Sequence, residues 1–365
     1  MTKIKNFLIT LIFVLVIGGF TVAHFALPDG DLSSWERRKL QQMPEITVSS
    51  LFDGSFMRSF ETYLTDQFPL RDSFRTLKAR FHFDVLGQRD NNDIYIVDGS
   101  ASKLDRKISH TSVNKFKNKI VSLYDTYLKD TDCKVYFSVI PDKNAYLTEG
   151  TLYPHFDYEE LMSLAADGLP EAFTTLDIAP HLSASSYYNT DSHWKQEEIV
   201  PLANYIRKKL GVKPLETLVK KDLGEFYGVY YGQSALPLEA DRLFYLSNDE
   251  IDGATVKSIE KEGETKVYDM SKADALDRYD IFLSGAVSIL EITNPKGEKG
   301  KELILFRDSF TSSLAPLLVP GYSKVTLIDI RYIPSKNVGN YVTFDNQDVI
   351  FIYGSGIVNN SSSLR

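Results

Sequence analysis

Two short motifs of this sequence hold three residue types that together can carry out nucleophilic acyl transfer. The first motif, residues 188–194, contains Asp191 and His193. Residues two apart in an extended segment project from the same side, so this carboxylate can fix one tautomer of the imidazole. The second motif, residues 305–310, contains Ser309 where an apolar run gives way to the start of a helix. This position predicts a serine hydroxyl at the carboxyl end of a strand.

Each of the three residues also has a structural interpretation. Asp191 can cap a helix expected at 195–209, and His193 can be a loop histidine before that helix. An Asp-x-His pair can bind a metal, but no second histidine or acid cluster stands at ligand spacing, so we predict no metal site. Asp308 and Ser309 can simply cap a helix. Catalysis is favoured by the order of strand, turn and helix, because free N–H groups at a helix start can stabilise an oxyanion.

The pattern along the rest of the chain predicts an α/β fold that positions both motifs. After residue 88, apolar runs alternate with helical patterns, which is typical of a parallel sheet flanked by helices. Because ligands bind at the carboxyl edge of such sheets, both motifs are expected at one edge. Residues 212–300 break the alternation and predict an insertion of short strands and loops. We expect strands at 93–97, 134–140, 173–178, 303–306, 325–330 and 349–353, and helices at 112–128, 158–166, 195–209 and 309–319.

An apolar segment near the amino terminus predicts a membrane anchor. Lys3 and Lys5 precede about 21 residues, 7–27, that contain no acid, Lys or Arg. This length spans a bilayer, and the basic flank favours a cytoplasmic start with an exported remainder. A cleaved signal peptide is the alternative, although the segment is long for one and no clear Ala-x-Ala site follows. We expect residues 1–27 to form a single-pass signal-anchor in the cell membrane, with the catalytic domain on the extracytoplasmic side.

The length and composition limit the possible binding partners and the bonds that can stabilise the fold. A chain of 365 residues can bury a sizeable core, and its net charge of −8 argues against nucleic-acid binding, which requires a basic face. Cys133 is the only cysteine, so no intramolecular disulfide can form, and its place before an apolar run predicts that it is packed. We expect a tether and helical lead-in at 28–88, a catalytic domain at 89–358 and a polar tail at 359–365.

Aromatic and cationic residues near the motifs are candidates for substrate contacts. Tyr188 and Trp194 can stack on sugar rings, and core packing is an equal alternative for both. Arg331 follows another predicted strand, where it can position a substrate oxygen or simply pair with Asp329. Arg307, two residues before the serine, is a further candidate.

Several sequence blocks in the same order resemble the DHHW protein family and, more distantly, the alginate O-acetyltransferases of the AlgJ and AlgX type. Ser192 stands where the family's name motif has its first histidine, and the alginate enzymes also have a hydroxyl residue there. Arg307 stands where we expect Lys in the DHHW proteins. The blocks extend over most of the part predicted to be exported, at residues 35–44, 63–71, 92–95, 140–143, 188–194, 308–310 and 328–331.

The resemblance implies an SGNH-hydrolase-like fold in which the acid and the base precede the nucleophile, a permuted order for that superfamily. Asp191 would be the triad acid, His193 the base and Ser309 the nucleophile, and the backbone N–H of Ser309 would be one oxyanion donor. Gly285 and Asn294 are candidates for the further oxyanion donors.

The function that follows is a membrane-anchored O-acetyltransferase that acetylates a secreted polysaccharide, such as an alginate-like or cellulose-like polymer, through an acetyl-serine. Since acetyl-CoA is absent outside the cell, we expect no bound cofactor. The acetyl group would come, ultimately from acetyl-CoA, through a membrane-bound O-acyltransferase partner beside a polysaccharide synthase complex. A carbohydrate acetylesterase with the same triad and a non-catalytic polysaccharide-binding scaffold remain as alternatives.

Overall fold

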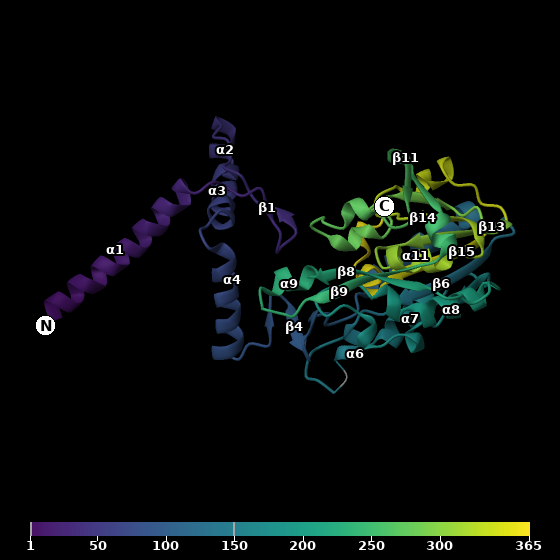
Figure 1. Ribbon diagram of the computed structural model, residues 1–365, viewed down its shortest axis with the longest axis horizontal. Helices are drawn as coiled ribbons and strands as arrows, with labels where there is room; N and C mark the ends of the chain where they lie inside the picture. The colour runs from purple at the N-terminus through teal and green to yellow at the C-terminus, as the bar shows by residue number, and fades with distance from the viewer. Residues whose placement is uncertain (1, 149) are drawn as a thin grey trace. The chain divides into compact units, whose positions relative to one another are not determined.

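The computed structural model describes residues 2–148 and 150–365, and the chain divides into two compact units (Figure 1). One unit contains the chain up to Asn92 together with Tyr231–Pro237. The other contains Asp93–Tyr230 and Leu238–Arg365, and the two motifs with Asp191, His193 and Ser309 fall within it.

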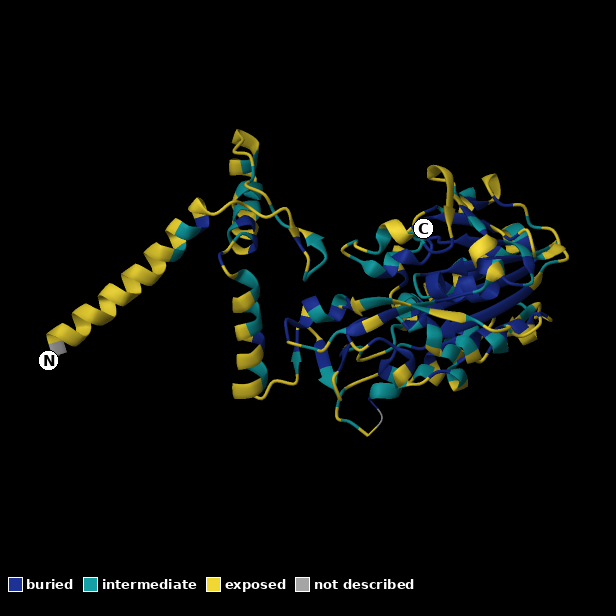
Figure 2. Cartoon of the chain, in the orientation of Figure 1, coloured by how far each residue is buried: buried dark blue, intermediate teal, exposed yellow. Residues whose placement is uncertain are grey.

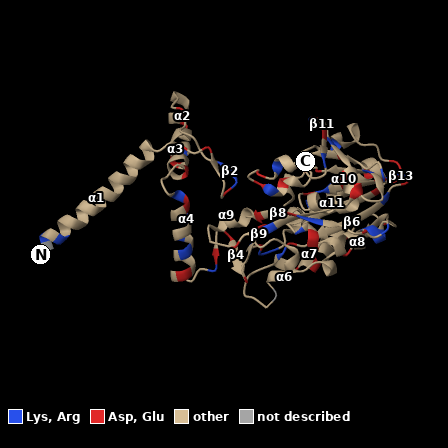
Figure 3. Ribbon diagram, viewed as in Figure 1, with Lys and Arg blue, Asp and Glu red and all other residues tan. Residues whose placement is uncertain are grey.

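The first unit is mainly helical. Its helix α1 (Thr2–Ala26) contains a stretch, Lys3–Ala26, that is long and apolar enough to cross a membrane, a test that a signal sequence also passes. Figure 3 shows charged residues on this helix only at its amino-terminal end. The later helices of the unit are α2 (Val48–Phe52), α3 (Ser55–Asp66) and α4 (Arg71–Arg80), and α4 continues as the π-helical turn η1 (Phe81–Val85).

The second unit is built on a central mixed sheet. Within the described residues its strands run in the order β11 (Lys261–Lys266), β10 (Thr255–Ser258), β12 (Ile289–Thr293), β14 (Tyr322–Ile328), β13 (Glu298–Arg307), β15 (Asp348–Gly354), β6 (Lys134–Ile140) and β7 (Phe173–Thr175). The strands from β14 to β7 are parallel, whereas β12, β10 and β11 are joined in antiparallel pairs. The predicted fold class is therefore confirmed, with a sheet that is parallel in its centre and antiparallel at one side.

Alternating side chains of β13 divide the core between the two faces of the sheet. Leu303 and Leu305 pack into one apolar cluster, and Ile304 and Phe306 pack into the other. This alternation follows from the two-residue period of a strand, and apolar residues in both phases require cover on both faces. The helices over the first cluster are α8 (Val200–Lys209) and α11 (Thr311–Leu318), and those over the second are α5 (His110–Leu123), α7 (Tyr158–Ala166) and α12 (Ser355–Asn359).

Several helices and strands begin or end at residues other than those predicted. The expected strand at 93–97 is β4 (Ile94–Val97), which pairs with β5 (Ser100–Lys103) in a small separate sheet. The expected helix at 195–209 begins as a 3₁₀ turn at Gln196–Glu198 and becomes α-helical only from Val200, where a proline stands in the first turn. The predicted insertion supplies the antiparallel strands β10 to β12 and the separate hairpin of β8 (Val219–Phe226) and β9 (Asp241–Ser247).

Candidate active site

The first motif folds as a tight hairpin that is fastened to the second motif. Tyr187 and Trp194 form an isolated antiparallel bridge, and the backbone N–H of Tyr188 donates to the carbonyl of His193. The indole N–H of Trp194 donates to the carbonyl of Phe310 and to Ser313 Oγ, each at 2.9 Å. A side chain of the first motif therefore holds the start of α11, which follows the serine.

The hairpin and the β13–α11 turn bring the three predicted catalytic residues together. His193 Nδ1 lies 2.7 Å from Asp191 Oδ1, and His193 Nε2 lies 2.9 Å from Ser309 Oγ. Asp191 Oδ1 also accepts the backbone N–H of His193 at 3.0 Å. These contacts have the connectivity of an acid, a base and a hydroxyl nucleophile.

The Asp191 carboxylate is buried and held in place by backbone groups. Its Oδ2 accepts the N–H of Val229 at 2.8 Å. The neighbouring Gly228 leaves no room for a side chain, because a Cβ there would lie 2.3 Å from both Asp191 Cβ and the carbonyl oxygen of Thr190. Glycine is therefore required at this position for the backbone to approach the acid closely.

His193 is mostly buried, and its environment favours the protonated ring. Burial opposes the charge, but the adjacent Asp191 carboxylate outweighs it, so the pKa of His193 lies above its ordinary value. The ring of Tyr279 stacks on the imidazole, with centroids 4.1 Å apart, and its hydroxyl is 2.8 Å from Ser313 Oγ. Burial raises the pKa of Tyr279, so this phenol stays neutral beside the base.

Ser309 lies in the turn between β13 and α11. The preceding Asp308 is buried, and its carboxylate accepts the backbone N–H groups of Phe310 at 3.1 Å and Gly354 at 2.6 Å. Among the described residues, the backbone N–H of Ser309 itself has no hydrogen-bond acceptor in the turn. The helix begins at Thr311 and not at the predicted residue 309, since Asp308 and Ser309 form the turn. The backbone N–H of Ser309 is consequently available to a ligand oxygen.

Ser309 and His193 line a cavity of about 220 Å³. Gly285 also lines it, so one of the two predicted further oxyanion candidates reaches the serine's surroundings. The other candidate, Asn294, does not line this cavity, because its amide donates to Glu250 and to the carbonyl of Val319. The remaining lining residues are Asp277, Tyr279, Asp280, Phe282, Ala286, Arg307, Ser312, Arg331 and Tyr332.

Two arginines in this lining differ in how their guanidinium groups are bound. Arg331 makes a bidentate pair with Asp329, at 2.9 and 2.6 Å, so it both pairs with this acid and faces the cavity. Arg307 is buried, and its Nη1 donates to Ser312 Oγ at 3.0 Å and to the Asp308 carbonyl. Its Nε and Nη2 have no partner among the residues that the structure describes. Burial lowers the pKa of Arg307, which reflects this poorly compensated cation.

Two residues predicted to contact substrate are placed elsewhere. Tyr188 and Trp194 are fully buried in the core, and neither lines the cavity. A ring without exposed faces cannot stack on a sugar, so the expectation for both is corrected to core packing. The indole N–H of Trp194 is satisfied by groups of the β13–α11 turn, which explains why a residue next to the base points inward.

Two buried residues that bind the backbone of the first motif, Lys143 and Asp241, were not predicted from the sequence. Lys143 is fully buried, and its Nζ donates to the carbonyls of Tyr188 at 2.8 Å and Asn189 at 3.3 Å. Burial lowers the pKa of Lys143 to about 8. From the other side, Asp241 accepts the backbone N–H groups of Asn189 and Thr190, each at 2.8 Å. Lys143 stands in one of the blocks that resemble the DHHW family, which was the available signal.

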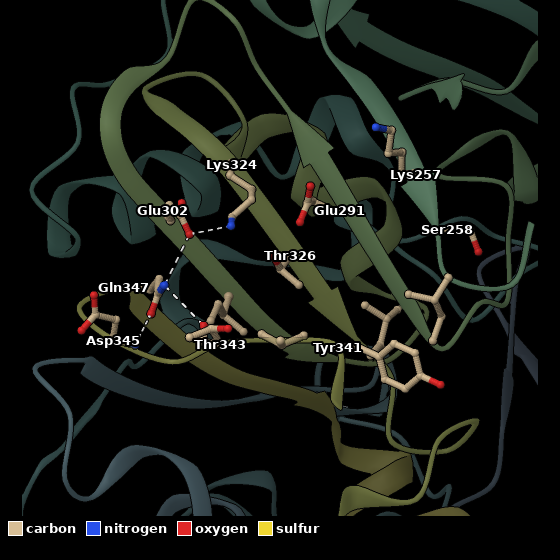
Figure 4. Close-up of a pocket in the computed structure, with 14 residues that line it drawn as sticks. Lys257, Ser258, Glu291, Glu302, Lys324, Thr326, Tyr341, Thr343, Asp345 and Gln347 are labelled. Atoms are coloured by element: carbon tan, nitrogen blue, oxygen red, sulfur yellow. Dashed lines mark hydrogen bonds and ion pairs between the residues drawn. The ribbon is translucent and has the colours of Figure 1, made fainter. Parts of the chain in front are cut away.

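A second cavity lies on the central sheet, and its lining does not include Asp191, His193 or Ser309. This groove has a volume of about 430 Å³ and is lined mainly by residues of β10, β12, β13, β14 and the loop before β15 (Figure 4). Lys324 pairs with Glu302 at 3.0 Å, and Gln347 donates to Glu302 at 3.4 Å. Glu291 and Tyr341 also line this groove.

The model of the DHHW protein family matches residues 174–328. This span contains Asp191, His193 and Ser309, and the resemblance expected from the sequence blocks is confirmed. No match was found among curated protein sequences.

Solved structures show the same fold at low sequence identity. A DHHW family protein from Eubacterium siraeum is 18% identical with a TM-score of 0.60, over 75% of this chain and 95% of that one. Bacillus cereus PatB1 is 16% identical with a TM-score of 0.59, over 73% of this chain and 96% of that one. The O-acetyltransferase domain of Pseudomonas putida AlgJ is 10% identical with a TM-score of 0.44, over 73% of this chain and 92% of that one. The first two likenesses support the α/β fold.

Proposed function

We propose that this chain is an O-acetyltransferase that transfers acetyl groups to a polysaccharide through Ser309. The observation that carries the proposal is the hydrogen-bonded series from Asp191 through His193 to Ser309, with both contacts of the imidazole below 3 Å, at the wall of a cavity. The match to the DHHW protein family over the segment that holds all three residues supports the same reading.

In the proposed first half-reaction, Ser309 Oγ attacks the carbonyl carbon of an acetyl ester while His193 Nε2 accepts the hydroxyl proton. The C–O bond of the donor then breaks, and the leaving oxygen takes the proton from His193. In the second half, a sugar hydroxyl gives its proton to His193 and attacks the acetyl-serine. Ser309 Oγ leaves and regains the proton, so no net charge or atom is lost. Asp191 stabilises the imidazolium that forms in each half.

The negative oxygen of each tetrahedral intermediate requires donors fixed in advance. We assign the backbone N–H of Ser309 as one donor, because it has no acceptor among the described residues. Arg307 is the proposed second donor, since two of its buried nitrogens lack partners and the side chain lines the same cavity. A cation beside the developing charge is most effective where water is excluded. Gly285 stays a candidate for a third.

We place this reaction outside the cytoplasm, with α1 as a single-pass anchor in the cell membrane. The apolar span and the lysines at its start support this placement. Since acetyl-CoA is a cytoplasmic thioester, the proposal needs a membrane partner, such as a membrane-bound O-acyltransferase, that presents acetyl groups on the outer side. A synthase complex would supply the nascent polymer, and alginate-like and cellulose-like chains both have suitable hydroxyl groups.

The test is acetyl transfer by the purified full-length chain in detergent, from an activated acetyl ester to an oligosaccharide, measured against release to water. Transfer that exceeds hydrolysis supports the transferase, whereas hydrolysis alone supports the acetylesterase alternative. A sulfonyl fluoride offers a second readout, because one structure of PatB1 contains a sulfonyl adduct. We expect covalent labelling of Ser309 and none in Ser309→Ala. A chain that binds polymer but shows neither turnover nor labelling would be the non-catalytic scaffold.

A further inference from the structure

Helix α4 and the turn η1 carry an apolar stripe on the outside of the amino-terminal unit. Its members follow one another at steps of three or four residues, so they lie on one side of the helix. Their exposed fractions lie between 42% and 69%. Figure 2 shows yellow, exposed segments along α4. A continuous apolar surface of this kind is rare on a protein that faces only water. The stripe consists of Leu70, Phe74, Leu77, Phe81 and Val85.

The opposite side of the same helix shows that the apolar side faces outward by construction. Arg71 and Arg75 point into the unit, where both pair with Glu36, at 2.5 and 3.3 Å. Arg75 also donates to the carbonyl of Gly232 at 2.7 Å, and Ala79 is fully buried. The helix therefore differs from the amphipathic helix of a soluble protein, since Arg71 and Arg75 are bound internally while the apolar stripe is left outside.

The stripe begins against the apolar helix α1. The ring of Phe20 stacks on Phe68 with centroids 5.3 Å apart and meets Phe74 edge-on at 5.6 Å. Next to these rings, residues of α1 and α3 together with Phe68 line an open groove of about 520 Å³, and most of these residues are apolar. Phe20 precedes Ala26, the last residue of α1, by six positions, which corresponds to ~9 Å along the helix axis. The first part of α4 is thereby fixed close to the end of the membrane span.

We propose that α4 and η1 lie in the outer interface of the bilayer that α1 crosses, with the stripe among the acyl chains. Helices of this type insert to a depth of about 5–10 Å, which agrees with contact near the last turns of a spanning helix. The exposed Lys78 and Arg80 flank the stripe, as expected for side chains that reach lipid headgroups. The proposal rests on the membrane anchor proposed above and does not depend on the acetyl-transfer chemistry.

The experiment places an environment-sensitive fluorophore on single cysteines of the full-length chain in liposomes. Cys133→Ser removes the native thiol, and probes are attached in Leu77→Cys or Phe81→Cys. Phe13→Cys on α1 reports the anchor, and Glu262→Cys on the polar strand β11 is the aqueous control. Each probe is titrated with aqueous iodide and, separately, with lipids that carry a quencher on their acyl chains.

The expected result is that probes at positions 77 and 81 are quenched by the lipids and protected several-fold from iodide relative to position 262. Quenching by iodide as at position 262 would place the stripe in water and overturn the proposal. Protection from both quenchers would also overturn it, because protein would then cover the stripe. If the lipid quencher does not affect the probe at position 13, the proposed membrane anchor is wrong. Acetyl transfer is measured on the same samples, so a failure of the anchor or of the stripe can be told apart from a failure of the proposed acetyl-transfer activity.

Discussion

The catalytic cavity and the groove on the open sheet differ in size and in the way their charged groups are bound. The groove, at about 430 Å³, is larger than the catalytic cavity at about 220 Å³. Both lysines that line it are paired, Lys324 with Glu302 within the groove and Lys257 with Glu264 beside it. The cavity beside Ser309 instead has the buried Arg307 in its lining and the buried Asp191 behind His193, both about 1% exposed. The comparison teaches that buried, directed charge and not volume marks the place where chemistry can occur.

The strongest test of this contrast is Ser309→Ala against Ser258→Ala, a serine that lines the groove. Loss of the nucleophile is expected to lower kcat for acetyl transfer by up to about 10⁶-fold, as removal of a catalytic serine does elsewhere. The groove variant should keep wild-type turnover, measured with the same ester and oligosaccharide. Comparable losses in the two variants, with both folded by circular dichroism, would remove the distinction between the cavities.

Asp191→Asn is expected to have the next largest effect, about 10⁴-fold on kcat, because the imidazole loses the partner that fixes its tautomer and stabilises its charge. The pH profile gives an independent reading. Catalysis needs neutral His193, and the pKa of this residue is raised, so activity rises as pH increases through that raised value. Removing the carboxylate should move the acidic limb of the profile to lower pH. An unchanged limb would mean that another group controls the titration.

Arg307→Met is expected to lower kcat by roughly 10²- to 10³-fold, the range for loss of one oxyanion donor. Methionine removes the charge and the N–H donors while its unbranched apolar chain fills part of the buried space. If Arg307 serves only the fold, the variant should show a changed melting temperature with kcat intact. Lys is the residue expected at position 307 in the DHHW proteins. If Arg307→Lys keeps part of the activity that Arg307→Met loses, the positive charge itself has a role.

The smallest effect is expected for the double variant Glu291→Gln and Tyr341→Ala in the groove. Both residues face solvent-accessible space on the sheet, so kcat and melting temperature should stay within about twofold and a few degrees of the wild type. Steady-state kinetics with a long oligosaccharide is the appropriate measurement. A rise in KM that grows with chain length would show that the groove binds the acceptor, and the comparison would need revision.

Local patterns were sufficient to single out Asp191, His193 and Ser309, which the structure brings together, because the spacing of the first two and the strand-to-helix position of the serine can be recognised in the sequence. The rule that ligands gather at the carboxyl edge of a parallel sheet then joined motifs that stand 116 residues apart. The burial of Trp194 was not readable, since an indole beside a catalytic histidine suits a sugar platform and a core equally well. Its direction depends on a carbonyl in a turn that is distant in sequence.

The predicted insertion was harder to interpret than the alternating core. Some of its residues contact the first motif only through tertiary folding, so no local pattern indicates them. Asp241 accepts a backbone N–H of that motif, and Tyr279 stacks on the imidazole of His193. Asn294 was misplaced because no local pattern indicates which loop of an insertion reaches the sheet edge. Long-range pairing of the antiparallel strands decides this, and periodicity carries no information about partners.

The bond from the Trp194 indole to the Phe310 carbonyl closes the intervening chain into a loop whose ends are fixed. The entropy of closing such a loop changes slowly with its length, by about 0.6 kcal/mol for each doubling. Residues 277–286, which form one wall of the catalytic cavity, belong to that loop. Because Trp194 and Phe310 hold the two ends, exposed positions of this wall can change while Asp191, His193 and Ser309 stay in place, whereas its buried positions Tyr279 and Phe282 cannot change at so little cost. Under the proposed function, such changes alter which acceptor sugar fits beside Ser309.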